Sequence, residues 1–496
     1  MRALCPVVTV ILLASTVAGE GPSRQSQSGS GNFVRIFQLP PFAPPTPAVT
    51  AALLELGKRG GLMDAHDDID AGPFALIVDP FLSRNNPDND QHTAGITFLG
   101  QFLDHDMTFD TTSRLGMPSN PRTSPNIRSA YFDLDSIYGG GPVGSPLLYD
   151  PADRAKFRVE SNGRFEDLPR DGSGTAIIAD PRNDENLVIA GLHVAFLLFH
   201  NRVVDMVRRD HPGWPSDDVF REARRFTVWH YQWIILRDVL PLFVGSAMVS
   251  DVTARGPQFY TPASGEAAIP VEFQIVYRFG HSMVRPSYRA NFTGDAGAPF
   301  FAMVFDTRPQ AGEPNDLRGG LRSPRRFVGW QTFFRFPGFE ADVRPNKRID
   351  TKLSSPLFDL PLAAIASGSP PTSLAQRNLL RHLTWRLPSG QSIATAIGAP
   401  ILSENDLAEL RSIHPEFVRA TPLWYYILKE AEILEDGHHL GPTGGRIVAE
   451  VFLGLLRTDP EGFLMKQPGF VPWLGIIPGE FHMTDLLSIA GVADKR

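Results

Sequence analysis

Cysteine is almost absent from this chain, because Cys5 is the only one among 496 residues. Cys5 lies in an N-terminal segment that we expect to be removed, so the mature chain should contain none. This excludes disulfides, thiolate metal sites and cysteine nucleophiles. Any bound metal ion must then be held by histidine, carboxylate or carbonyl groups.

An excess of basic residues is also absent. The chain has 47 Lys and Arg against 54 Asp and Glu, a net charge of −7 and a pI of about 6.0. This balance argues against a dedicated nucleic-acid-binding protein. Residues 31–496 contain no internal repeat and no long low-complexity linker. With 42% hydrophobic residues, 34 of them Phe, the chain is expected to form one large domain with an aromatic core.

The N-terminus has the pattern of a secretory signal. Arg2 precedes an apolar stretch from about Val7 to Val17, and the small residues Ala18 and Gly19 follow. A membrane anchor is the alternative, but the stretch is shorter than the roughly 20 residues that a span needs. We predict a signal peptide over 1–19, a flexible leader over 20–40 and one domain over 41–496. The protein is then secreted or periplasmic, without a stable membrane span.

Helical periodicity dominates the rest of the chain. It predicts helices over 94–107, 183–210, 217–245 (stopping near Pro241) and 447–459. The second of these is nearly all apolar and ends in basic residues, as the helix dipole favours, and His193 and His200 interrupt its apolar run. Strand patterns are few and short, for example 271–279 and 445–448. The expected fold is mainly α.

One polar cluster lies inside the apolar helix predicted over 94–107. Gln101, Asp104 and His105 are three or four residues apart and share a face. Asp106 is rotated by about 100° and can serve a different neighbour. A solvated loop is the alternative interpretation of Asp-His-Asp, but the flanking Phe and Leu residues favour a buried helix.

A second cluster, in 126–141, offers hard oxygen donors. Ser129, Tyr131, Asp133 and Asp135 alternate along the chain and supply a hydroxyl, a backbone carbonyl and two carboxylates. Such donors suit Ca²⁺. The alternative is a turn with exposed aspartates. The spacing differs from that of an EF-hand loop.

Three further segments carry polar residues that are ambiguous when taken alone. Arg182 and Glu185 stand where a helix begins, as a surface capping pair would. His281 lies among apolar residues, as a core histidine with satisfied hydrogen bonds would. Asn378 and Arg381 are three residues apart on one helical face.

Taken together, these segments closely resemble the animal-type haem peroxidases of the peroxidase–cyclooxygenase superfamily, as a secreted member of bacterial type. The resemblance runs in the family's order over roughly residues 65–460. The distal motif G-Q-x-x-D-H-D matches 100–106, and the arginine motif matches 180–186. The proximal motif R-[YF]-G-H matches 278–281, and N-x-x-R with a later Leu-Pro matches 378–381 and 387–388.

The resemblance implies a haem enzyme that reduces hydrogen peroxide while oxidising small donors such as halides, thiocyanate or phenols. His105 would be the distal base, with Arg182 and Gln101 as the other catalytic residues. A neutral imidazole can take the proton of peroxide and return it, and a fixed arginine charge stabilises the negative charge that develops. His281 would be the axial iron ligand, and Asn378 would accept its other N–H, making the imidazole more basic.

The resemblance also implies how haem and calcium are held. Asp104 and Glu185 match positions that form ester bonds to haem methyl groups. Arg278 and Arg381 match positions near the haem propionates. Asp106 matches a calcium ligand, and the remaining expected calcium ligands are Ser129, Tyr131, Asp133 and Asp135.

Departures from the family keep alternatives open. Asn186 stands where one branch has a methionine bonded to haem, so that bond is not expected. A fatty-acid dioxygenase of the cyclooxygenase-like branch would need Tyr three residues before the proximal His, where this chain has Arg278, with Tyr277 one residue further back. A non-catalytic secreted scaffold or adhesion protein is a second alternative, which no RGD, immunoglobulin-like or repeat segment supports. Asn291 in "NFT" is a glycosylation acceptor if the source is a eukaryote.

Overall fold

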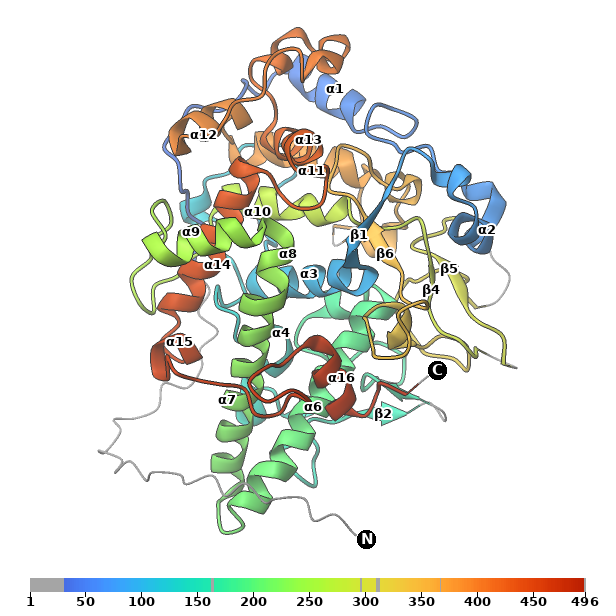
Figure 1. The fold of residues 1–496 in the computed structure, drawn as a ribbon, viewed down its shortest axis with the longest axis vertical. Helices are drawn as coiled ribbons and strands as arrows, with labels where there is room; N and C mark the ends of the chain where they lie inside the picture. Colours follow the sequence, from blue (N-terminus) through green and yellow to red (C-terminus); the bar gives the residue numbers. More distant parts are fainter. Residues whose placement is uncertain (1–30, 162–164, 295–296, 309–312, 366, 495–496) are drawn as a thin grey trace.

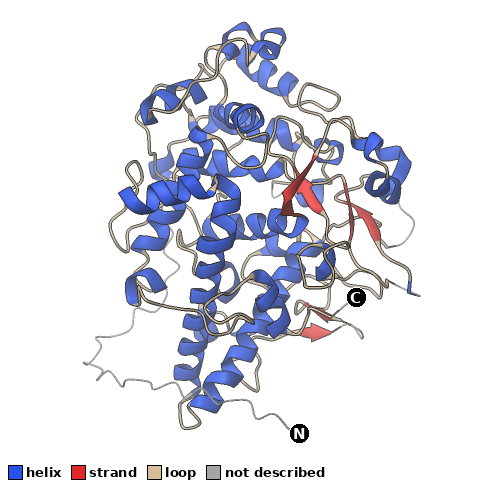
Figure 2. Ribbon diagram, viewed as in Figure 1, coloured by secondary structure: helices blue, strands red, loops and turns tan. Residues whose placement is uncertain are grey.

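The computed structural model describes residues 31–161, 165–294, 297–308, 313–365 and 367–494. Helices dominate these residues and the strands form short pairs (Figure 2), as the mainly α prediction requires. Three antiparallel pairs join β1 (Asp88–Thr93) with β6 (Pro345–Lys347), β2 (Glu160–Ser161) with β3 (Glu166–Asp167), and β4 (Ser287–Arg289) with β5 (Phe301–Met303).

The α-helices in chain order have the following bounds: α1 Pro47–Leu56, α2 Gly72–Val78, α3 Ala94–Met107, α4 Asp135–Tyr138, α5 Gly141–Gly144, α6 Leu187–Asp210, α7 Ser216–Ile234, α8 Leu240–Val244, α9 Ser246–Arg255, α10 Val271–Val276, α11 Leu374–Trp385, α12 Gly390–Ile397, α13 Leu423–Leu434, α14 Pro442–Thr458, α15 Phe463–Lys466 and α16 Met483–Ala490.

Helix α3 passes through the centre of the molecule (Figure 1) and has the bounds predicted from its periodicity. Of its 14 residues, all are buried except Gln101 and Asp104. Its apolar side packs on α6, where the rings of Phe102 and Phe196 stack with centroids 5.0 Å apart. Burying one such ring contributes about 1.5–3 kcal/mol. The helix is therefore fixed on nearly all sides, and its two uncovered polar residues share one face.

Helix α6 begins later than predicted. A 3₁₀ turn, η5 (Pro181–Asp184), precedes it, and the side chain of Asn186 caps it by accepting the N–H of Val188 at 2.8 Å. Within the described residues, α6 is the one unbroken helix long and apolar enough to cross a membrane, but 78% of its most apolar window is buried inside the fold. It packs against α7 and α16.

Three local predictions are wrong. Val271–Val276 and Gly445–Val448 are helical parts of α10 and α14, although their β-branched residues favour strands. All six residues of α10 are buried, and packing on both sides overrides the weak strand propensity. The helix over 217–245 does not stop at Pro241. It widens into a π-helical turn at Ile235–Val239, and Pro241 then lies near the start of α8.

The chain is packed before residue 41, the predicted start of the domain. Phe33 and Phe37 are buried, and the N–H of Val34 donates to the carbonyl of Ile269 at 3.1 Å. The predicted signal peptide lies outside the described residues.

Asn291 is fully buried, and its amide nitrogen donates to the carbonyls of Arg325 and Phe327. It is therefore not available as a glycosylation acceptor.

Candidate active site

One cavity collects the predicted site residues from four separate parts of the chain. Its volume is about 290 Å³. It is bounded by α3, by the η5 turn, by the 3₁₀ turn η7 (Tyr277–His281) and by α11, and apolar residues of 304–365 close one side. Eight predicted residues line it: Gln101, Asp104, His105, Arg182, Glu185, Arg278, His281 and Arg381.

His105 extends from α3 to one wall of the cavity. Its Nδ1 lies 2.9 Å from the Oδ1 of Asn183, which leaves Nε2 for the cavity. Burial, reinforced by the nearby charge of Arg182, lowers the pKa of His105 to about 4. The imidazole is therefore neutral near pH 7 and can accept a proton.

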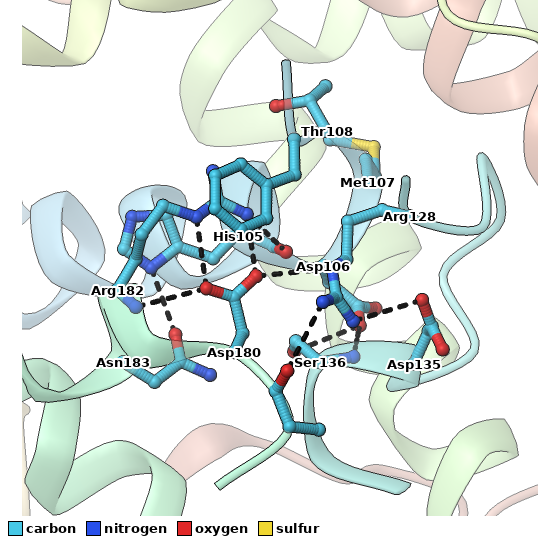
Figure 3. Close-up of polar contacts among 12 residues, drawn as sticks. His105, Asp106, Met107, Thr108, Arg128, Asp135, Ser136, Asp180, Arg182 and Asn183 are labelled. Carbon is cyan, nitrogen blue, oxygen red and sulfur yellow. Dashed lines mark hydrogen bonds and ion pairs between the residues drawn. The ribbon is translucent and has the colours of Figure 1, made fainter. Parts of the chain in front are cut away.

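Arg182 is held beside His105 by a buried carboxylate, as Figure 3 shows. Its Nε and Nη2 donate to the two oxygens of Asp180 at 3.0 and 2.7 Å, and Nη2 also donates to the carbonyl of His105 at 3.0 Å. The guanidinium lies 4.1 Å from the ring centroid of Phe109. Asp180 in turn pairs with Arg128 at 3.2 Å. These contacts fix the cation at the cavity wall.

His281 ends the η7 turn and lines the same cavity. Burial, with a smaller effect of Arg278, lowers its pKa to about 3, so the ring is neutral and can ligate a metal ion. Its Nδ1 lies 2.7 Å from the amide Nδ2 of Asn378. The prediction paired the same two residues, but with the amide oxygen accepting. In the structure that oxygen instead accepts from Nη1 of Arg278 at 3.4 Å.

Cationic side chains line the cavity on the α11 side. Burial lowers the pKa of Arg278 to about 10, which still leaves it charged at neutral pH. Arg381 pairs with Asp110 at 2.9 Å, and Arg377 lies one turn before it on α11. Such guanidinium groups are suited to carboxylates of a bound group.

Two carboxyl groups, those of Asp104 and Glu185, also line the cavity. Oδ1 of Asp104 accepts from the hydroxyl of Thr108 at 3.1 Å. Burial raises the pKa of Glu185 to about 7, although the charge of Arg182 opposes this. Asn186 also lines the cavity. Carboxyl and amide groups therefore line the cavity together with the arginines.

The expected calcium ligands lie together but do not converge. Asp106 accepts hydrogen bonds from Ser136, from the N–H of Leu134 at 3.0 Å and from the hydroxyl of Tyr231 at 3.2 Å. Burial, opposed by these bonds and assisted by Asp135, raises its pKa to about 7. The pKa of Asp133 is also raised well above its usual range by burial and by the neighbouring carboxylates. Among the described residues, no three His, Cys, Asp or Glu side chains are placed to hold a metal ion.

The remaining three expected calcium ligands make other contacts. The Ser129 hydroxyl accepts the N–H of Tyr131 at 3.2 Å, and the Tyr131 hydroxyl donates to the carbonyl of Thr458 at 3.2 Å. Asp135 pairs with Arg128 at 3.2 Å. The acidic loop is thus tied to the rest of the fold by hydrogen bonds and an ion pair.

Three residues that hold His105 and Arg182 in place were given no role from the sequence. They are Arg128, Asp180 and Asn183. Asp180 could have been found, because Asp before Pro at the start of a helical turn is a capping signal, and its Oδ1 accepts the N–H of Arg182 at 3.0 Å. Arg128 and Asn183 carry no such local signal, because their partners are distant in the sequence.

Comparison with known proteins finds a family match over part of the chain. Residues 110–299 match the family model described as animal haem peroxidase. Eosinophil peroxidase of the mouse (Mus musculus) is 32% identical over 200 residues. This match covers 36% of the present chain but 27% of the mouse protein. The chain therefore spans well under two thirds of that relative.

Solved structures with a similar fold cover nearly the whole chain. Peroxidase A of Dictyostelium discoideum has a TM-score of 0.61 at 16% identity, over 94% of this chain and 91% of that chain. Rice (Oryza sativa) fatty acid alpha-dioxygenase has a TM-score of 0.54 at 16% identity, over 93% and 86%. At such low identity the likeness shows the fold alone. The matched model covers residues 110–299, less than half of the chain, so this stretch resembles the animal haem peroxidases, and the solved structures show that the whole chain shares their kind of fold.

Proposed function

We propose that the chain is a haem-dependent peroxidase that reduces hydrogen peroxide while oxidising small donors: halides, thiocyanate or phenols. One observation carries the proposal: His105 and His281, which are 176 positions apart in the chain, line one cavity together with Arg182. Neutral imidazoles on two walls suit a metal ligand and a proton acceptor. The animal haem peroxidases that residues 110–299 match bind haem, and the residues that line the cavity fit that group.

Haem bound here would supply the redox chemistry of its iron. His281 would ligate the iron through Nε2, which requires the ring proton on Nδ1. The amide oxygen of Asn378 would accept a hydrogen bond from that Nδ1–H if the side-chain amide were rotated by 180°. This turn would release Arg278 from Asn378, and Arg278 and Arg381 would then be available to the propionates.

His105 and Arg182 have complementary tasks in this proposal. Nε2 of His105 accepts the proton of hydrogen peroxide and then donates it to the departing oxygen. The guanidinium of Arg182, already fixed by Asp180, stabilises the negative charge that forms at that oxygen. Gln101, exposed on the same face of α3, can hydrogen-bond the bound peroxide.

A fatty-acid dioxygenase is the second candidate, favoured by one observation. The phenol of Tyr277 lines the cavity and donates to the carbonyl of Gly100 at 3.1 Å. Tyr277 is four residues before His281, whereas the cyclooxygenase-like pattern places Tyr three residues before. The peroxidase proposal is preferred for that reason.

The purified protein tests these alternatives directly. A peroxidase should show a Soret band and peroxide-dependent oxidation of a phenol, and a comparison of bromide, iodide and phenol would identify the donor class. Oxygen uptake with an unsaturated fatty acid and no added donor would favour the dioxygenase. If the protein binds haem but shows neither activity, both enzyme proposals would be contradicted. The non-catalytic scaffold would then be the alternative that remains.

We also propose that the chain is exported, on the basis of its N-terminal pattern. The sequence of the mature N-terminus checks this, and it should begin after about Gly19. A mature protein that retains Met1 and stays in the cytoplasm would contradict export.

Covalent attachment of haem is the next expected result. Asp104 and Glu185 both present carboxyl groups to the cavity, so each can form an ester with a haem methyl group. After reaction with peroxide, denaturing extraction should leave haem on the wild-type protein and release it from the Asp104→Asn, Glu185→Gln double variant. Mass spectrometry of the denatured chain measures this. Complete release from the wild type would disprove the esters.

Calcium at the acidic cluster of Asp106, Asp133 and Asp135 completes the proposal. Burial raises the pKa of Asp106 and Asp133, and neighbouring carboxylates, Asp135 among them, raise both further; a divalent cation would remove that repulsion. Binding would have to displace hydrogen bonds that Asp106 accepts. Calcium at 100 times its Kd should stabilise the fold by about 2.7 kcal/mol.

Thermal unfolding with calcium and with a chelator measures this effect. Asp133→Asn should abolish the difference between the two conditions. Asp350→Asn is the matched control, because Asp350 is another buried carboxyl with a pKa raised to about 7 and lies outside the cluster. Equal unfolding temperatures for the wild type in calcium and chelator would reject the site.

A further inference from the structure

A hydrogen-bonded chain behind the distal histidine runs from α3 to α6. Nδ1 of His105 lies 2.9 Å from Oδ1 of Asn183, and Nδ2 of Asn183 lies 3.0 Å from Nδ1 of His193. All three residues are buried, Asn183 completely so. The amide of Asn183 therefore connects two imidazoles through its two different atoms.

We propose that Asn183, itself oriented by His193, is a positioning residue that keeps the proton of His105 on Nδ1 and its lone pair on Nε2. The inference rests on the proposed peroxidase function and assigns a role to residues that do not line the cavity. An amide oxygen can only accept a hydrogen bond, so the facing Nδ1 of His105 must donate. The remaining ring nitrogen, Nε2, is then unprotonated and faces the cavity.

The tautomer of His193 is coupled to the orientation of the Asn183 amide. An amide nitrogen only donates, so Nδ1 of His193 must accept and its ring proton lies on Nε2. If the amide were turned over, both rings would change tautomer together, and His105 would present N–H to the cavity. Both rings are buried, and a neutral imidazole carries one ring proton. The hydrogen bonds through Asn183 therefore allow two arrangements, the one described and the one with the amide turned over.

The charge of Arg182 favours the arrangement proposed. Its guanidinium lines the same cavity wall as His105 and contacts the carbonyl of that residue. A lone pair directed toward a fixed cation is stabilised, whereas an N–H directed toward it is repelled. The orientation of Asn183 and the position of Arg182 thus favour the same tautomer.

The tautomer can be read directly by ¹⁵N NMR of histidine-labelled holoprotein in its diamagnetic ferrous carbon monoxide form. In the wild type, we expect the proton of His105 on Nδ1 and that of His193 on Nε2. In Asn183→Leu, the His105 tautomer should become mixed or change to Nε2–H. Asn183→Asp keeps an acceptor at the same place and should restore Nδ1–H.

The kinetic consequence should follow the tautomer. Asn183→Leu should lower the rate constant for the reaction with hydrogen peroxide at least about 10-fold, since a wrong histidine tautomer costs about 10⁴-fold in a serine protease. Asn183→Asp should recover most of that loss. The rate constant is measured per bound haem, so a general loss of folded protein would not by itself lower it, and recovery in Asn183→Asp would not follow from folding alone.

A matched control lies on the same helix. His200 is also fully buried on α6, but its ring contacts Tyr138 and the carbonyl of Ala155 instead of the cavity. His193→Phe should mix the tautomers of His105, whereas His200→Phe should leave them unchanged.

An Nε2–H tautomer of His105 in the wild type, or an unchanged tautomer in Asn183→Leu, would overturn the proposal. A wild type with the expected tautomer but no reaction with peroxide would reject the peroxidase function instead. If the protein does not bind haem, ¹⁵N NMR of the haem-free protein still tests the tautomer of His105, independently of the peroxidase function.

Discussion

Replacing His105 with alanine is expected to slow the reaction with hydrogen peroxide by about two to four orders of magnitude at neutral pH, the usual contribution of a positioned acid–base group. Among the described residues that line the cavity, His105 is the imidazole on the α3 wall and His281 the one on the η7 wall. Removing the first leaves Arg182 in place but no neutral base beside it. Stopped-flow measurement of the first spectral change after mixing with peroxide gives the rate constant.

The pH dependence of the same rate constant gives a second check. Burial lowers the pKa of His105 from 6.5 to about 4. The neutral form is the active base and is present above that pKa, so the wild-type rate should stay level from pH 8 to about pH 5 and fall only as the pH approaches 4. An unshifted histidine would already lose half of its rate at pH 6.5. The alanine variant should lack this acid limb.

His200→Gln is the control for a loss of buried imidazole outside the cavity. It should change thermal stability but leave the peroxide rate close to that of the wild type. A His105→Ala variant that reacts at the wild-type rate, with its haem bound, would remove His105 from the mechanism.

Parts of the fold could be predicted from the sequence where the apolar periodicity of a segment matched only one type of secondary structure. The apolar period of α3 gave its bounds, because almost every residue of that helix is buried against other elements. The strand predicted over 271–279 failed for the opposite reason. A short run of Val, Ile and Phe fits a buried helix as well as a buried strand, and only the surrounding packing makes Val271–Val276 helical.

The site could be predicted where residues belong to motifs and not where they act through distant partners. His105, Arg182 and His281 stand in recognisable strings, and the cavity contains all three. Asn183 is 78 positions from His105, the residue that it contacts, and in the sequence it resembles any polar residue at a helix start. The direction of a single hydrogen bond, as between His281 and Asn378, also depends on a third residue, Arg278, that competes for the same amide.

Replacing His281 with alanine is expected to have the largest effect on haem binding. The axial ligand would be lost, so affinity should fall by more than the roughly 10–100-fold that removal of an outer partner such as Asn378 costs. Asn378→Ala is therefore expected to be intermediate. Soret absorbance per protein chain after titration with haem measures both variants against the wild type.

His382→Gln separates ligation from packing in this experiment. His382 is a fully buried histidine on α11, one turn beyond Asn378, and its Nε2 accepts the backbone N–H of Trp424 at 3.0 Å. It does not line the cavity, so its variant should bind haem with near wild-type affinity even if the fold is less stable.

Added imidazole should restore the Soret band of His281→Ala, because it can occupy the volume that the side chain leaves. Full haem affinity in His281→Ala without added imidazole would mean that the iron takes its axial ligand from elsewhere, and the facing pair of histidines would no longer explain the cavity.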